Sequence, residues 1–124
     1  MAEIKNSKRY DLEERTMNFA RRVNEYVRML PKDIPNIENG KQLVRAAGSV
    51  GANYIEANES LGKKDFQMRI RISRKESKEA RFWIELSAPS IQHAEEKGLL
   101  IREATELMHI FGAILEKTKP EAHV

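Results

Sequence analysis

The chain has 124 residues, which fits one domain and leaves little room for a second. Hydrophobic residues make up 40% of it and charged residues 33%, a balance typical of a globular protein rather than a disordered one. The lack of cysteine excludes disulfides, thiolate metal sites and cysteine nucleophiles. No apolar run is long enough to span a membrane and residues 1–10 do not form a signal peptide, so we expect a cytoplasmic protein with no membrane partner.

Positive charge is concentrated in one segment. Residues 63–81 contain eight Lys and Arg against three Asp and Glu, an excess of five, whereas the net charge of the whole chain is +3. A local basic stripe is typical of nucleic-acid-binding surfaces, although a solvated helix face produces the same pattern. The segment is therefore the first candidate for a polyanion site.

A first helix is predicted to begin at Asp11, which forms a capping-box arrangement with Glu14. Residues 1–10 are then expected to be a flexible N-terminus. Apolar residues recur at three- and four-residue steps as far as residue 30, and Pro31 and Pro35 should end the helix and define a loop.

A second helix is predicted over about residues 38–59, with an apolar face that continues to Leu61. Small residues crowd positions 46–52, and a glycine in an exposed helix costs about 1 kcal/mol relative to alanine. This pattern predicts close approach of a neighbouring helix. Gly48 and Gly51 match neither the P-loop nor the dinucleotide-binding pattern, so a phosphate loop is disfavoured.

Polar side chains form a stripe beside that apolar face. Its members follow steps of three or four residues: Gln42, Arg45, Ser49, Asn53 and Glu56. We interpret the stripe as a structural polar network with the next helix, in which Glu76 and Glu79 pair with Arg45 or Arg69. A catalytic role is disfavoured because Ser49 has no credible base one turn away.

A third, long helix is predicted to begin at residues 63–65 and to end or kink by Pro89. Glu76 and Glu79 fall inside its apolar arc, an arrangement that a general acid/base pair or half of a di-metal site would also produce. The metal alternative is disfavoured because the Glu-x-x-His motif occurs once, at residues 106–109. We expect no metal, no cofactor and no small-molecule substrate.

The opposite face of the third helix carries the basic residues. Six cations lie within about a third of its circumference and are the candidate nucleic-acid-binding residues: Lys64, Arg71, Arg74, Lys75, Lys78 and Arg81. Phe82 projects on the same side, where it would either stack on a base or be buried by a second subunit. We favour burial by a second subunit.

A fourth helix is predicted over about Ile101 to Lys117, with Gly98 as a helix cap before it and a frayed tail over residues 118–124. Apolar residues cover more than half of its circumference, which is more than a lone bundle needs and predicts self-association. The candidate interface residues, which all lie outside the expected core arc, are Phe82, Val44 and Ile55.

Several short motifs are spread over about residues 10–115. They are Asp11-Leu12, Arg15-Thr16, Phe19-Ala20, Gln42-Leu43, Arg45-Ala46, Ser49-Val50, Ala52-Asn53, Glu56-Ala57, Lys63-Lys64-Asp65-Phe66, Lys75-Glu76, Glu79 and Phe82-Trp83. Together they resemble the S23-like family, four-helix bundles encoded in intervening sequences of bacterial 23S ribosomal RNA genes. Relatives of that family include the accessory protein of diversity-generating retroelements, a pentameric barrel with a basic, nucleic-acid-binding surface. The resemblance therefore implies a homopentamer.

Taken together, the patterns and the resemblance predict an all-α protein, an antiparallel up-down four-helix bundle over residues 11–117 that is kinked or interrupted near Pro89. We expect it to be non-enzymatic, to self-associate and to bind RNA or DNA non-specifically through the basic face of the third helix. The alternative is a protein-interaction adaptor or assembly subunit whose basic face meets an acidic protein.

Overall fold

The computed structural model describes residues 2–119, with side chains described for residues 11–119. Four long helices make up nearly all of it: α1 (Ala2–Arg28), α2 (Ile34–Asn58), α3 (Lys63–Leu86) and α4 (Ala94–Lys117), with a short 3-10 helix, η1 (Ile91–His93), leading into α4. No strand occurs in this part of the chain. The predicted all-α, four-helix architecture is confirmed.

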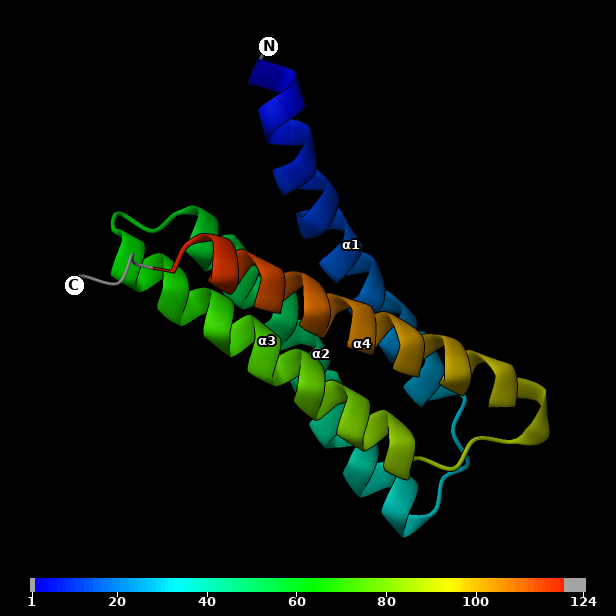
Figure 1. The fold of residues 1–124 in the computed structure, drawn as a ribbon. Coiled ribbons are helices and arrows are strands. Elements are labelled where there is room, and N and C mark those ends of the chain that lie inside the picture. The colour runs from blue at the N-terminus through cyan, green and yellow to red at the C-terminus, as the bar shows by residue number, and fades with distance from the viewer. Residues whose placement is uncertain (1, 120–124) are drawn as a thin grey trace.

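Successive helices run in opposite directions, as an up-down bundle requires (Figure 1). The α2–α3 contact is the most extensive and the α3–α4 contact is next, whereas the α1–α4 contact is the smallest among the four pairs of adjacent long helices. In Figure 1, α1 is inclined to the other three helices, and its N-terminal half projects beyond them. Within the described range, no helix combines the length and apolarity that a membrane span needs.

The core is built from side chains at three- and four-residue steps on each helix. Its largest fully buried members come from all four helices: Phe19, Val23, Leu43, Val50, Ile70, Ile84, Leu100, Leu107 and Phe111. Leu61 was expected to extend the α2 face, but it is fully exposed because α2 ends at Asn58 and the chain turns away.

Three helices, α1, α2 and α4, begin earlier than the sequence patterns predict. The α1 helix starts at Ala2 rather than Asp11, since residues 2–10 contain no glycine or proline to interrupt it. The α2 helix starts at Ile34, where the Asp33 carboxylate accepts a hydrogen bond from the Asn36 amide at 2.9 Å. Pro35 therefore occupies the first turn of a helix, where its missing N–H is not needed, instead of a loop.

The α3 helix ends at Leu86, as the downstream Pro89 requires, and the bundle is interrupted there. The connection is held by the buried Asn36 of α2, whose side chain both donates to the Ala88 carbonyl, at 3.0 Å, and accepts from the Ala88 amide, at 2.9 Å. Because α4 already begins at Ala94, Gly98 lies inside that helix and is not a cap. Met1 and residues 120–124 of the predicted tail lie outside the described residues.

Candidate nucleic-acid interface

The basic residues of α3 lie on its outward side because its opposite side is buried against α2 and α4. Small and apolar residues at helical spacing fill that buried side, among them Ser73, Ser77 and Ala80. Five of the six predicted cations are exposed, and Arg81 is half-buried. The predicted basic face therefore exists as one surface.

Arg81 differs from the other five cations in its partners. Its guanidinium lies 2.9 Å from a Glu85 carboxylate oxygen and donates to the Thr105 hydroxyl of α4 at 3.5 Å. In the described part of the chain, the other five form no ion pair or side-chain hydrogen bond: Lys64, Arg71, Arg74, Lys75 and Lys78. Most arginines outside this face, by contrast, pair with a carboxylate: Arg15, Arg22, Arg28 and Arg45. The outer face of α3 thus carries five exposed cations that no described carboxylate neutralises.

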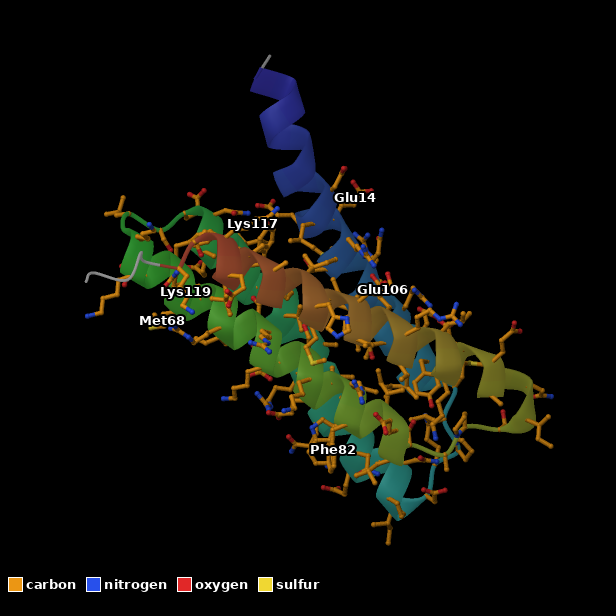
Figure 2. All side chains as sticks on the ribbon, viewed as in Figure 1. Glu14, Met68, Phe82, Glu106, Lys117 and Lys119 are labelled. Carbon is orange, nitrogen blue, oxygen red and sulfur yellow. The ribbon has the colours of Figure 1, made fainter. Side chains whose placement is uncertain are left out.

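An open hollow of about 620 Å³ lies among these cations, and we call it the α3 hollow. Most of its exposed surface is apolar, because the hydrocarbon parts of the charged side chains contribute to it. The lining residues are Met68, Arg71, Ile72, Arg74, Lys75 and Lys78 from α3 together with Met108 from α4. Figure 2 shows Met68 on the outward side of α3, towards the start of the helix. The sequence patterns did not identify this hollow, because it forms only where Met108 of α4 lies beside Met68 and Ile72 of α3.

The guanidinium of Arg74 lies over a glycine of α4. A methyl group built on Gly112 would lie 3.7 Å from Arg74 Nε, which is an ordinary van der Waals contact. The edge of the α3 hollow towards α4 is therefore a charged group supported by a second helix.

The polar stripe of α2 divides into two groups. Arg45 donates to Glu79 at 2.9 Å and lies 3.8 Å from Glu76, which confirms the predicted ion pairing between α2 and α3 through Arg45. Arg69 instead donates to the Asn53 amide oxygen at 3.0 Å, and the Asn53 nitrogen donates to the carbonyl and hydroxyl of Ser49, both at 2.9 Å.

Two members of the stripe belong to neither group. The side chains of Gln42 and Glu56 are exposed and make no hydrogen bond or ion pair with other described residues. Both face solvent, so for these two residues the predicted network is wrong.

The carboxylate of Glu76 is an unusual buried group. The residue is buried, and its Oε1 atom has no hydrogen-bond partner. Among residues 11–119, no three His, Asp or Glu side chains converge in a way that would hold a metal ion. Glu76 and Glu79 are 9% and 31% exposed and share Arg45, so they form an ion-paired connection between helices.

The three candidate interface residues lie on two separate surfaces. Phe82, which is labelled in Figure 2, is 54% exposed and packs edge-on against Trp83 with ring centroids 5.0 Å apart. It borders a small hollow with Met108 of α4. Val44 and Ile55 are 39% and 41% exposed on α2. Eleven residues of helix turn them only about 20° apart, so they share one strip of α2, which also includes the exposed Gly48.

The predicted close approach of a helix to the glycines of α2 is right for one of them. A methyl group at Gly51 would lie 2.9 Å from Thr16 Oγ1 of α1, whereas a methyl group at Gly48 would have no neighbour within 4 Å. The α1 helix therefore crosses α2 at Gly51. Gly48 faces away from the bundle.

Charged residues connect α1 to α4 where their apolar contact is small. Arg15 donates two hydrogen bonds to Glu103, at 2.7 and 2.8 Å, and one to Glu106, at 2.8 Å; Figure 2 shows Glu106 where the two helices cross. The hydrogen bonds that Arg15 donates to Glu103 are the main cause that raises the pKa of the Arg15 guanidinium. The sequence patterns missed this cluster because its members are 88 and 91 residues apart.

The comparisons with known proteins agree with this fold. A family model described as 23S rRNA-intervening sequence protein matches residues 8–112. The chain belongs to this family. The S23-like resemblance predicted from the short motifs is thereby confirmed.

A solved structure supports the same assignment to the 23S rRNA-intervening sequence protein family. It is the crystal structure of a protein with unknown function from the S23 ribosomal protein family of Bacteroides thetaiotaomicron, which is 25% identical to this chain and superposes with a TM-score of 0.75. The match covers 88% of this chain and 98% of that one. A comparison with curated proteins found no match. Neither the family description nor the structural relative assigns a reaction.

Proposed function

We propose that this protein is a non-enzymatic, self-associating helical bundle that binds RNA or DNA through the outer face of α3. The observation that carries the proposal is the set of unpaired cations on that face. Four arginines elsewhere in the bundle are paired with carboxylates, whereas five cations of the α3 face have no carboxylate partner among the described residues. A polyanion supplies the missing negative charges and releases its own counterions on binding.

The binding is proposed to be independent of sequence. Exposed Lys and Arg side chains on the outside of a packed helix are suited to contact phosphates, and phosphate contacts position a nucleic acid without reading its bases. The affinity should therefore fall steeply as salt concentration rises.

Self-association is proposed to use the exposed apolar surfaces of α2 and α3. The two surfaces are different: one is the α2 strip with Val44, Gly48 and Ile55, and the other surrounds Phe82 of α3. The α2 strip of one subunit can therefore cover the Phe82 surface of the next. Such head-to-tail contacts close into a ring when the rotation between subunits allows it. The number five rests on the family resemblance alone.

Charge reversal on α3 tests the nucleic-acid proposal. The triple variant Arg71→Glu, Lys75→Glu and Lys78→Glu should lose binding to structured RNA and single-stranded DNA at low salt. The slope of its log affinity against log salt concentration should also become shallower by about 2, because three single-strand phosphate contacts are lost. The matched control is the triple variant Arg102→Glu, Lys117→Glu and Lys119→Glu, which makes the same change in charge at exposed positions.

The control triple should keep most of the binding. If the α3 triple bound as tightly as the unaltered protein, or if the two triples lost affinity equally, the proposed interface would be wrong. Fluorescence anisotropy with labelled oligonucleotides measures both variants under one set of conditions.

The alternative function is an adaptor that meets an acidic protein through the same face. The modest net charge of +3 favours this alternative, because many nucleic-acid-binding domains are more basic overall. A pull-down from nuclease-treated extract separates the two functions. An acidic protein partner would stay bound after the treatment, whereas a nucleic-acid partner would be lost.

A further inference from the structure

The α3 hollow has a chemistry that phosphate binding alone does not need. Met68, Ile72 and Met108 supply apolar surface, and Met68 is 45% exposed. All four charged residues of the lining are positive, and no carboxylate is among them. A ligand that fits must therefore combine negative charge with a flat or compact apolar group.

We propose that the α3 hollow binds an unpaired nucleobase, so that the ligand of this surface is single-stranded rather than duplex nucleic acid. The inference rests on the proposed function above and specifies which nucleic acid that function serves. The occupant is a strand whose base lies against the methionines while its phosphates meet Arg71, Lys75 and Lys78.

The side chains of the hollow suit a planar ring. Methionine is flexible and polarisable, and its sulfur makes favourable contacts with aromatic rings of different shapes, which fits bases of any identity. The guanidinium group of Arg74, which the proposal does not assign to a phosphate, is planar and suited to stack on an aromatic face. A hollow of about 620 Å³ is in the range of small-ligand sites, so it has room for a nucleoside-sized group.

A duplex would not use this surface fully. Its bases are stacked inside the helix, so a duplex lying on α3 would contact the cations through phosphates and leave the apolar lining uncovered. An unpaired strand can turn a base outwards and cover it. Apolar contact and charge complementarity together therefore favour the single strand.

Three labelled probes of equal length test the inference: a single-stranded oligouridylate, the same backbone with abasic residues, and a blunt duplex. Fluorescence anisotropy at one salt concentration should show the oligouridylate bound about tenfold more tightly than the abasic strand. The duplex should bind no more tightly than the abasic strand.

A double variant locates the effect. Met68→Ala with Met108→Ala should weaken oligouridylate binding about tenfold and leave abasic binding unchanged. The matched control is Met17→Ala with Met29→Ala, since both of these methionines are about half exposed on α1 and the loop after it. The control should bind all three probes as the unaltered protein does.

A measurement on the unaltered protein does not depend on how the variants fold. Oligouridylate that carries 4-thiouridine should crosslink to peptides containing Met68, Ile72 or Met108. Crosslinks confined to other segments would overturn the inference.

The remaining outcomes separate this inference from the proposed function. Equal affinity for the three probes would overturn the single-strand inference and leave a general polyanion surface. If none of the three probes bound, both the single-strand inference and the proposed nucleic-acid-binding function would be wrong. If an acidic protein displaced the oligouridylate and unlabelled nucleic acid did not, the result would contradict both and support the adaptor.

Discussion

Arg45 joins α2 to two carboxylates of α3, and the three side chains differ in their access to solvent. Arg45 is 57% exposed, so water screens its interaction with Glu76 and Glu79. Arg45→Ala is expected to lower the free energy of unfolding by about 1–2 kcal/mol, below the roughly 3–5 kcal/mol seen when a fully buried pair is broken. Urea denaturation measures this free energy, with Arg102→Ala as control, since Arg102 is exposed and pairs with no carboxylate among the described residues.

A loss for Arg45→Ala no larger than for Arg102→Ala would show that the ion pair contributes nothing. The double variant Arg45→Ala with Glu79→Gln then gives the pairwise coupling between the two side chains.

The hydroxyl of Tyr26 lies 2.6 Å from Ser87 Oγ, inside the junction of α1 and the α3–α4 connection. Burial raises the pKa of Tyr26, and the hydrogen bond with Ser87 opposes this with a smaller effect. Above pH about 10 an unfolded tyrosine loses its proton, whereas the folded Tyr26 keeps it. Unfolding then releases a proton, so the free energy of unfolding falls as the pH rises through this range.

We expect stability to fall less steeply between pH 9 and 11 in Tyr26→Phe than in the unaltered protein. At pH 8 the variant should be less stable by about 1 kcal/mol because its hydrogen bond is lost. All other ionisable side chains are the same in both proteins, so their contributions cancel in the comparison. Parallel stability profiles from urea denaturation at each pH would contradict the role given to Tyr26.

At the scale of the helices, Gly48 and Gly51 are less than one turn apart in α2 but have opposite surroundings. Thr16, which a methyl group at Gly51 would contact, is fully buried, and its hydroxyl donates to the Glu13 carbonyl at 2.9 Å. Gly51→Ala should therefore lower the free energy of unfolding by about 1–2 kcal/mol, because α1 must shift. Gly48→Ala should raise it by about 1 kcal/mol through helix propensity alone.

The two alanine variants serve as controls for each other, because each makes the same chemical change in the same helix. Urea denaturation at matched protein concentration gives the comparison. Equal stabilisation by both would mean that α1 moves away from α2 without cost, contrary to the tight crossing at Gly51.

At the scale of the whole molecule, assembly and polyanion binding should be lost together. A ring would bring several basic faces into one assembly, and many weak phosphate contacts then act on one ligand. Light scattering at micromolar concentration should give a mass several times that of one chain, 14.3 kDa. Val44→Glu with Ile55→Glu should reduce it to one chain and weaken nucleic-acid binding, because buried carboxylates disfavour the subunit contact.

The control for this pair is Gln42→Glu with Gln92→Glu, which adds the same charge at exposed positions outside the strip. It should leave the mass unchanged. A mass of 14.3 kDa for the unaltered protein would contradict both the ring and the cooperation between its basic faces.

The sequence by itself determined the features that repeat along a single helix. Four helices, the end of α3 before Pro89 and the outward basic face follow from helical periodicity and from proline geometry. The pairing of Arg45 with Glu76 and Glu79 was also predictable, because these side chains border apolar faces that had to meet. For the helices, the end of α3 and the basic face, the physical cause acts within a few residues of chain, whereas the Arg45 pairing follows from the meeting of two apolar helix faces.

Only the tertiary structure decided which helix lies opposite each residue and how close it comes. Periodicity gives the angle of a side chain around one helix axis, but it carries no information about the neighbour across the gap. Gly48 and Gly51 look alike in the sequence, and the crossing of α1 alone distinguishes them. The α3 hollow depends in the same way on Met108 from a different helix, and the Arg15 cluster on carboxylates far along the chain.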